Sequence, residues 1–224
     1  MKYFPLLLLF LLAASLLHAE VEAPEFAPLP FDLKPEETLS ASQNWMSLNE
    51  AAGIQAMKQE GKMVLMMANN ARFRSSDVAA YPEVMTLKAS WQITNGKGAM
   101  GFGWIDFSTS QYYYLYEDLA TNELILQRGD GVSTKQLAKY PLSTATEPRQ
   151  FTITRKAQTA AEIVITILVN GAAVGDPVTD RPEQEMGSTF QIYVGSGNDA
   201  EVTLHSISTI KATSRKGSGS GWFW

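Results

Sequence analysis

The sequence predicts an all-β fold, an antiparallel two-sheet sandwich of the jelly-roll type. From Lys62 onward, β-rich segments follow one another at intervals of about ten residues, which is the spacing expected of a sandwich. Turn-forming pairs such as Asn95-Gly96 and Asn170-Gly171 separate neighbouring segments. The same region contains no convincing run with helical periodicity. These three observations together favour antiparallel strands joined by hairpins.

The first strands of the predicted domain differ in pattern. Lys62–Ala68 (KMVLMMA) is apolar on both faces, as expected of a buried strand. Val84–Thr94 alternates strictly, and this places Trp91 on the apolar, core-facing side. Ala99–Phe107 follows, with glycines on one face and larger side chains on the other. The remaining predicted strands are Tyr112–Glu117, Glu123–Arg128, Lys135–Tyr140, Gln150–Arg155, Glu162–Asn170, Phe190–Gly195 and Glu201–Ile210.

The N-terminus reads as a secretory signal peptide over residues 1–19. Lys2 supplies the positive charge, and the apolar run Pro5–Leu17 is shorter than the ~20 residues that a membrane span needs. We expect cleavage after Ala19, with a retained N-terminal anchor as the alternative. The chain is therefore expected to be exported in a bacterium, to the periplasm, the cell surface or the medium.

The mature chain divides into three parts. Residues 20–39 are rich in Pro, Glu and Ala and are predicted to be a linker or lead-in segment. Residues 40–212 are expected to form the sandwich, and residues 213–224 a flexible Gly/Ser tail. This tail ends in Trp222, Phe223 and Trp224, which could contact a membrane surface or a partner. The alternatives are a docked tail or an end without function.

Composition excludes several classes of function. A net charge of −5 with scattered basic residues argues against nucleic acid as a partner. Two histidines and no cysteine leave too few soft ligands for a catalytic zinc site and rule out a Cys-His nucleophile. We expect neither a cofactor nor a bound metal.

Five segments carry a resemblance to a known superfamily. They are MVLMMANNARFRSS, TLKASWQITNGKGAMGFGW, QYYYLYED with the following ATNELILQR, FTITRK with EIVITILVNGAAV, and FQIYVGSGNDAEVTLHSISTI. Over roughly Ser40 to Lys211, their order resembles the concanavalin A-like lectin/glucanase superfamily. Within it, the pattern is similar to the laminin-G-like bacterial branch, which includes the domain of keto-disaccharide hydrolases. The resemblance implies a concanavalin A-like sandwich, but a fold does not determine a function.

The chain departs from the catalytic members of that superfamily. Their glucanases carry a Glu-x-Asp-x-x-Glu run on one strand, and no segment here matches it. The acidic cluster of Glu117, Asp118 and Glu123 has a different spacing and spans a turn. His205 stands near the position where many relatives place a calcium-binding Asp, and imidazole is a poor ligand for calcium. The sequence therefore favours a protein without catalysis and without that calcium site.

The resemblance places ligands across one concave sheet, where sugars stack on aromatic rings and bond to amides and carboxylates. Arg72 and Gln127 are further hydrogen-bonding candidates there. The alternative is that Trp104 and the tyrosines fill the core. The predicted ligand-binding patch consists of Gln92, Trp104, Asp106, Tyr112, Tyr114 and Arg74.

Three functions follow in order of preference. The first is an exported, lectin-like module that binds a saccharide or another cell-envelope ligand without catalysis. The second is a glycoside-processing enzyme that uses carboxylates such as Asp106 and Glu117 on the concave face, although paired carboxylates at about 5–10 Å are needed. The third is a structural or adhesive module of the cell envelope.

Overall fold

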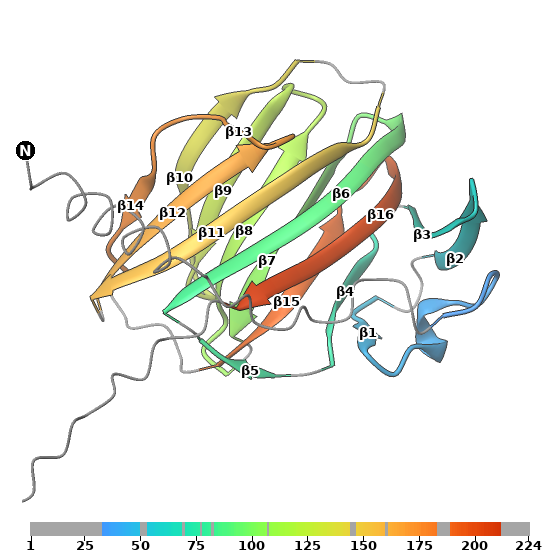
Figure 1. Cartoon of the computed structure of the whole chain (residues 1–224), viewed down its shortest axis with the longest axis horizontal. Coiled ribbons are helices and arrows are strands. Elements are labelled where there is room, and N and C mark those ends of the chain that lie inside the picture. Colours follow the sequence, from blue (N-terminus) through green and yellow to red (C-terminus); the bar gives the residue numbers. More distant parts are fainter. Residues whose placement is uncertain are drawn as a thin grey trace, which may run out of the picture.

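The strands of the computed structural model run from Trp45 to Lys211 and form two antiparallel sheets packed face to face (Figure 1). The structure describes residues 33–49, 53–68, 70–76, 78–81, 83–106, 108–143, 147–159, 161–182 and 189–211. The predicted signal peptide and the aromatic tail, including Trp222, Phe223 and Trp224, lie outside these residues. The all-β jelly-roll prediction is confirmed.

The first sheet, sheet A, has the strand order β1-β4-β15-β7-β8-β9-β10, and β5 pairs with β15 beside this path. Its strands are β1 (Trp45–Ser47), β4 (Arg72–Ser75), β5 (Ala79–Ala80), β7 (Ala99–Asp106), β8 (Gln111–Asp118), β9 (Glu123–Gly129), β10 (Thr134–Pro141) and β15 (Thr189–Ser196). The run β7-β8-β9-β10 is a meander of consecutive hairpins. Strand β15 reaches β7 from a distant part of the chain.

The second sheet, sheet B, has the order β13-β12-β11-β6-β16-β3-β2, and β14 pairs with β12. Its strands are β2 (Ile54–Gln59), β3 (Lys62–Ala68), β6 (Val84–Gly96), β11 (Arg149–Thr159), β12 (Glu162–Val169), β13 (Ala172–Ala173), β14 (Val178–Asp180) and β16 (Ala200–Lys211). In Figure 1 its long strands β12, β11, β6 and β16 cross in front of the meander of sheet A. From Leu33, where the described residues begin, one 3₁₀ turn, η1 (Leu39–Ala41), precedes β1.

The core lies between the sheets and is rich in aromatic side chains. Trp91 of β6 stacks on Phe151 of β11 at a ring-centroid distance of 4.0 Å, and meets Phe102 of β7 edge-on at 5.5 Å. These contacts join both sheets through one fully buried indole, as the alternation of Val84–Thr94 predicts. Leu33 and Leu39, at the end of the predicted lead-in segment, are also buried.

The predicted tight turn at Asn170-Gly171 is confirmed, whereas the predicted turn pair Asn95-Gly96 forms the end of strand β6. Asn170 and Gly171 both have positive φ, 51° and 81°, between β12 and β13. Positive φ at both central residues is the conformation that Asn-Gly pairs favour in hairpins, because glycine has no Cβ to clash. These hairpins fix the register, and therefore decide which side chains of each strand face outward.

Candidate functional site

Strand β8 places a row of tyrosines on the outer face of sheet A. Its residues alternate between buried and half-buried along the whole strand. Tyr113 and Leu115 are fully buried between the sheets, whereas Tyr112, Tyr114 and Tyr116 are half-buried on the other side. Because strand side chains alternate with a period of two, the three half-buried rings share the outer face.

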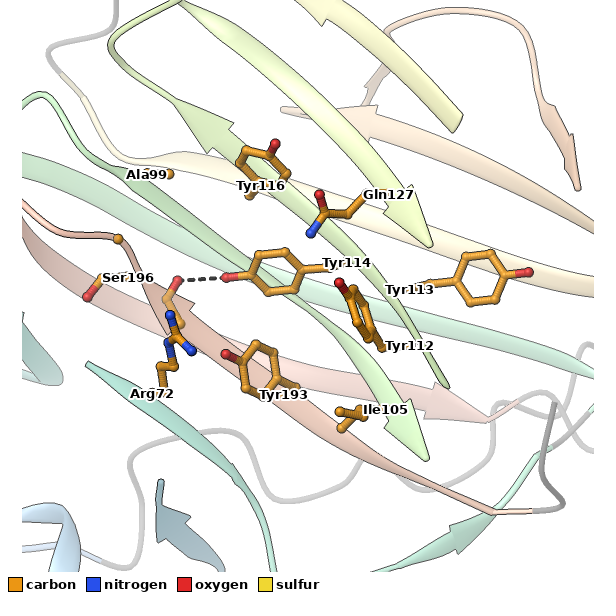
Figure 2. Close-up of a pocket in the computed structure, with 12 residues that line it drawn as sticks. Arg72, Ala99, Ile105, Tyr112, Tyr113, Tyr114, Tyr116, Gln127, Tyr193 and Ser196 are labelled. Carbon is orange, nitrogen blue, oxygen red and sulfur yellow. Dashed lines mark hydrogen bonds between the residues drawn. The ribbon is translucent and has the colours of Figure 1, made fainter. Parts of the chain in front are cut away.

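Two glycines on β7 let the central tyrosine lie flat on the sheet. Gly103 is opposite Tyr114 in the ladder, and Gly101 is opposite Tyr116. A Cβ at Gly101 would lie 2.8 Å from Cζ of Tyr114, so any larger residue would displace the ring. The Tyr114 ring instead crosses β7, and its hydroxyl donates a 2.8 Å hydrogen bond to the carbonyl oxygen of Gly195 on β15 (Figure 2).

These rings form one side of a pocket of about 430 Å³ on the outer face of sheet A, a volume within the usual range for small-ligand sites. Tyr193 of β15 faces Tyr114 with ring centroids 5.4 Å apart and ring planes at 61°. Tyr116 stacks beside Tyr114 at 5.8 Å. The lining residues are Arg72, Ala99, Ile105, Tyr112, Tyr113, Tyr114, Tyr116, Gln127, Tyr193, Gly195, Ser196 and Gly197.

Polar groups lie at the edges of this aromatic surface. Gln127 of β9 is directly opposite Tyr114 in the ladder and points its amide toward the pocket (Figure 2). Tyr112 packs its ring over Gly129, and its hydroxyl lies 2.9 Å from Oγ1 of Thr134. Aromatic faces beside a few placed polar groups are typical of pockets that bind small polar ligands.

Burial keeps the pocket phenols protonated. The pKa of Tyr114 is raised well above its ordinary value, first by burial and then by the neighbouring Tyr193, and Arg72 opposes this rise. The pKa of Tyr193 is also raised by burial, again against the effect of Arg72. Both hydroxyl groups are neutral at physiological pH, as ordinary phenols are, and burial extends this neutral range to higher pH.

The structure brings two residues of the predicted patch together at this pocket. Tyr112 and Tyr114 line the pocket together. Arg74 is on the outer face of β4, opposite Tyr193, but it does not line the pocket. Its guanidinium donates a 2.7 Å hydrogen bond to Oε1 of Gln191.

The structure corrects the other three positions of the patch. Trp104 is fully buried and stacks on Tyr113 at 5.3 Å, because the glycines of β7 take the outer face and leave its large side chains to fill the core. Asp106 has the same inward parity and is also buried, with its Oδ1 accepting hydrogen bonds from the backbone and the hydroxyl of Ser108. Gln92 lies on β6 of sheet B, so it is on the opposite side of the sandwich.

Tyr193 of the pocket was not predicted from the sequence. Tyr193 lies on a strand that was predicted as a closing strand, and its alternation with Gly195 was visible. However, β15 enters sheet A between β4 and β7, and residues 72–75 and 99–106 are far from it in the sequence. Alternation gives the face of a residue within its strand, but not which strands become neighbours.

The carboxylates considered for catalysis do not reach the pocket. Glu117 is buried between the sheets, where it accepts a 3.0 Å hydrogen bond from Nε1 of Trp91 and pairs with Arg149. Asp106 is buried as described above. No carboxylate is among the described residues that line the cavity. Within the described part of the chain, no group of three or more His, Asp or Glu side chains could hold a metal ion.

In the part of the chain that the structure describes, no helix has the length and apolar character needed to cross a bilayer.

Comparison with known proteins shows the fold class but assigns no sequence family. No family model and no curated protein matches the sequence. Among solved structures, the carbohydrate-binding module CBM66 from Bacillus subtilis matches at 14% identity and TM-score 0.52, over 74% of this chain and 94% of that one. The potassium-bound carbohydrate recognition domain of Emp46p matches at 14% identity and TM-score 0.59, over 84% and 97% of the two chains.

The solved structure of an enzyme matches this chain about as well as these two binding domains do. The β-glucanase of Bacillus licheniformis matches at 10% identity and TM-score 0.58, over 85% of this chain and 99% of that one. The protein therefore has the concanavalin A-like lectin/glucanase fold, as the sequence resemblance implied. Since both binding modules and hydrolases share this fold at such low identity, the likeness shows the fold alone.

Proposed function

We propose that the protein is a non-catalytic saccharide-binding module that uses the pocket on the outer face of sheet A. The observation that carries this proposal is the set of four tyrosines around one cavity, Tyr112, Tyr114, Tyr116 and Tyr193. Sugar C–H groups pack against aromatic faces, while their hydroxyls bond to edge groups such as the Gln127 amide. Carbohydrate-binding neighbours with the same fold support this ligand class.

The lining of the pocket supports binding over hydrolysis. Glycoside hydrolysis generally needs two carboxyl groups on either side of the scissile bond, at about 5–10 Å from each other. The described lining contains none, and Glu117 is engaged inside the sandwich. The proposal therefore assigns no catalytic residue.

Export forms the second part of the proposal. The N-terminal Lys2 and the apolar run Pro5–Leu17 support a signal peptide, and saccharide ligands are abundant outside the cell. We also propose that Trp222, Phe223 and Trp224 contact a membrane surface or a partner. Cell fractionation of the full chain against a variant lacking residues 217–224 tests both.

The binding proposal is tested with a panel of soluble polysaccharides, including β-1,3-1,4-glucan, agarose oligomers and a pectic galacturonan. Isothermal titration should find at least one ligand, and a reducing-end assay should find no product. Replacing Tyr193 with alanine removes one face of the pocket, so we expect about tenfold weaker binding or more, equivalent to at least 1.4 kcal/mol. Gln127→Ala should also weaken binding because it removes an edge amide.

Gln92→Ala is the matched control for Gln127→Ala. Both residues are glutamines on central strands, but Gln92 faces outward from sheet B, away from the pocket. Binding should therefore be unchanged in Gln92→Ala. If folded Tyr193→Ala and Gln127→Ala variants, checked by circular dichroism, bind as well as the unaltered protein, the pocket is not the binding site. Release of reducing ends that persists in a highly purified sample would favour the hydrolase alternative.

A further inference from the structure

The side chains of Arg72, Tyr114 and Tyr193 come together over Gly195, at the β15 side of the pocket. A Cβ placed on Gly195 would lie 3.3 Å from the hydroxyl oxygens of both Tyr114 and Tyr193, and 3.4 Å from Cγ of Arg72. Arg72 is directly opposite Gly195 in the ladder between β4 and β15. Figure 2 shows its guanidinium beside the two phenols, at the edge of the cavity. The lack of a side chain at Gly195 thus lets Arg72 and the two phenols pack closely together beside the cavity.

Arg72 is the single charged side chain among the described residues that line the pocket. The ion pairs found within the described part of the chain join other residues: Arg128–Asp180, Lys139–Glu123, Arg149–Glu117 and Arg181–Glu162. None of these ion pairs includes Arg72, so no carboxylate of the described residues neutralises its positive charge. Arg72 is an exposed residue, so its guanidinium is open to an anionic ligand at the edge of the pocket.

The other charged groups on this face strengthen the asymmetry. Arg74 lies two residues further along β4 with the same parity, and its guanidinium donates a hydrogen bond to Gln191. Asp118 and Glu123 are on the same face beyond Tyr116, and Glu123 is paired with Lys139 at 2.7 Å. The β4 side of the pocket is thus basic, and the acidic groups lie beyond its opposite end.

Tyr193 supplies a donor next to this charge. Its hydroxyl has no hydrogen-bond partner within the described parts of the chain, whereas the hydroxyl of Tyr114 already donates to Gly195. A guanidinium forms two parallel hydrogen bonds to a planar carboxylate and also binds sulfate oxygens well. A phenol beside it can donate a third hydrogen bond to the same anionic group.

We propose that the pocket selects acidic saccharides, with a uronic acid carboxylate or a sulfate ester held by Arg72 and Tyr193. The sugar ring that carries this group lies against Tyr114. The inference rests on the proposed saccharide-binding function and adds to it the charge class of the ligand. It also accounts for a cationic pocket edge on a protein whose net charge is −5.

Two pairs of ligands test the inference by isothermal titration. Oligogalacturonate is compared with its methyl ester, and sulfated carrageenan oligomers are compared with the same oligomers after desulfation. At least one acidic member should bind about tenfold more tightly than its neutral partner, and added salt should weaken its binding. Discrimination only in the first pair identifies a carboxylate as the ligand group, and only in the second pair a sulfate.

Variants connect the preference to Arg72. Arg72→Gln should abolish discrimination between acid and neutral partner, while Arg72→Lys should keep part of it because it retains the charge without the bidentate geometry. Lys156→Gln is the matched control, since Lys156 is exposed on β11 of sheet B and its loss changes the net charge equally. The Lys156→Gln variant should bind the acidic ligand as tightly as the unaltered protein does.

The outcomes separate the two proposals. If acidic and neutral partners bind equally, or if folded Arg72→Gln keeps the preference, the acidic-saccharide inference is overturned while saccharide binding stands. If neither these ligands nor the other polysaccharides of the panel bind, the proposed function is overturned along with it.

Discussion

The side chain of Glu117 is open to two interpretations from the sequence, a catalytic role and a structural role. A glutamate beside a row of tyrosines suggests a catalytic carboxylate, yet its parity on β8 places it with Tyr113 and Leu115 on the inner face. There it accepts a hydrogen bond from the Trp91 indole and pairs with Arg149 of β11. This pair links the two sheets, because β8 belongs to sheet A and β11 to sheet B.

Removing one partner of this buried pair should destabilise the protein strongly. Glu117→Ala leaves the Arg149 charge without a carboxylate in a desolvated site, and such losses typically cost about 3–5 kcal/mol. Glu117→Gln should cost less, because the amide oxygen can still accept from Trp91. Urea unfolding monitored by tryptophan fluorescence measures both changes.

An ion pair at the surface serves as the control for the buried pair of Glu117 and Arg149. Arg181 and Glu162 are 2.6 Å apart, but the Arg181 side chain is 76% exposed. Arg181→Ala should therefore change the free energy of unfolding by less than about 1 kcal/mol. Equal effects of Glu117→Ala and Arg181→Ala would contradict a structural role for the buried pair.

Strand β7 shows what an alternating pattern can and cannot predict. The sequence predicts that Gly101 and Gly103 share one face and that Trp104 lies on the other, and the structure confirms this. The alternating pattern alone does not show which of the two faces is the core, since a large aromatic side chain suits either the core or a ligand-binding surface. The decision comes from the neighbouring strand, because the glycine face of β7 is filled by the Tyr114 ring from β8.

The pairing of distant strands is the part of the site that the sequence does not reveal. Tyr112 and Tyr114 were predicted because they lie on one strand with a clear period. Tyr193 joins them only because β15 pairs with β7. Gln92 was misplaced for the same reason, since strand alternation contains no information on the sheet to which β6 belongs.

Gly101→Ala should affect both the pocket and the stability. The added methyl group would lie 2.4 Å from Cβ of Tyr116, 2.5 Å from the carbonyl oxygen of Leu115 and 2.8 Å from the Tyr114 ring. We expect a loss of about 1–3 kcal/mol from overpacking, together with weaker saccharide binding as the Tyr114 ring is displaced. Thermal unfolding and titration with the ligand found in the panel measure the two effects.

Gly53→Ala provides the control for this steric argument. A Cβ at Gly53 meets no atom within 4 Å, and its φ is not in the left-handed region. Stability and binding should therefore stay close to those of the unaltered protein. A Gly101→Ala variant as stable as Gly53→Ala, with binding intact, would show that Tyr114 does not need the open glycine face.

At the scale of the whole molecule, tyrosines are buried in two separate layers. Tyr113 and Tyr81 lie on the inner side of the sandwich, where Tyr113 donates a 2.6 Å hydrogen bond to Asp180 and Tyr81 contacts the Arg155 guanidinium. Tyr114 and Tyr193 lie in the pocket on the outer face. Burial is the largest cause of a raised pKa in all four phenols.

This distribution predicts that the fold is lost at high pH. A phenol whose pKa is raised in the folded state binds its proton more tightly there than in the unfolded chain. Its contribution to stability is complete below the ordinary pKa of about 10 and is lost as pH rises above that value. Each such group can lower the free energy of unfolding by up to about 1.4 kcal/mol per pH unit in that range.

Tyr113→Phe tests the prediction at a single group, because the phenylalanine cannot ionise. Asp180 remains paired with Arg128 in this variant, at 2.9 Å. At pH 7 the variant should be less stable than the unaltered protein, since it lacks the hydrogen bond to Asp180. Between pH 10 and pH 11, its free energy of unfolding in urea should fall less steeply than that of the unaltered protein. Parallel curves over this interval would mean that Tyr113 ionises equally well in the folded state, and that its burial between the sheets does not oppose its charge.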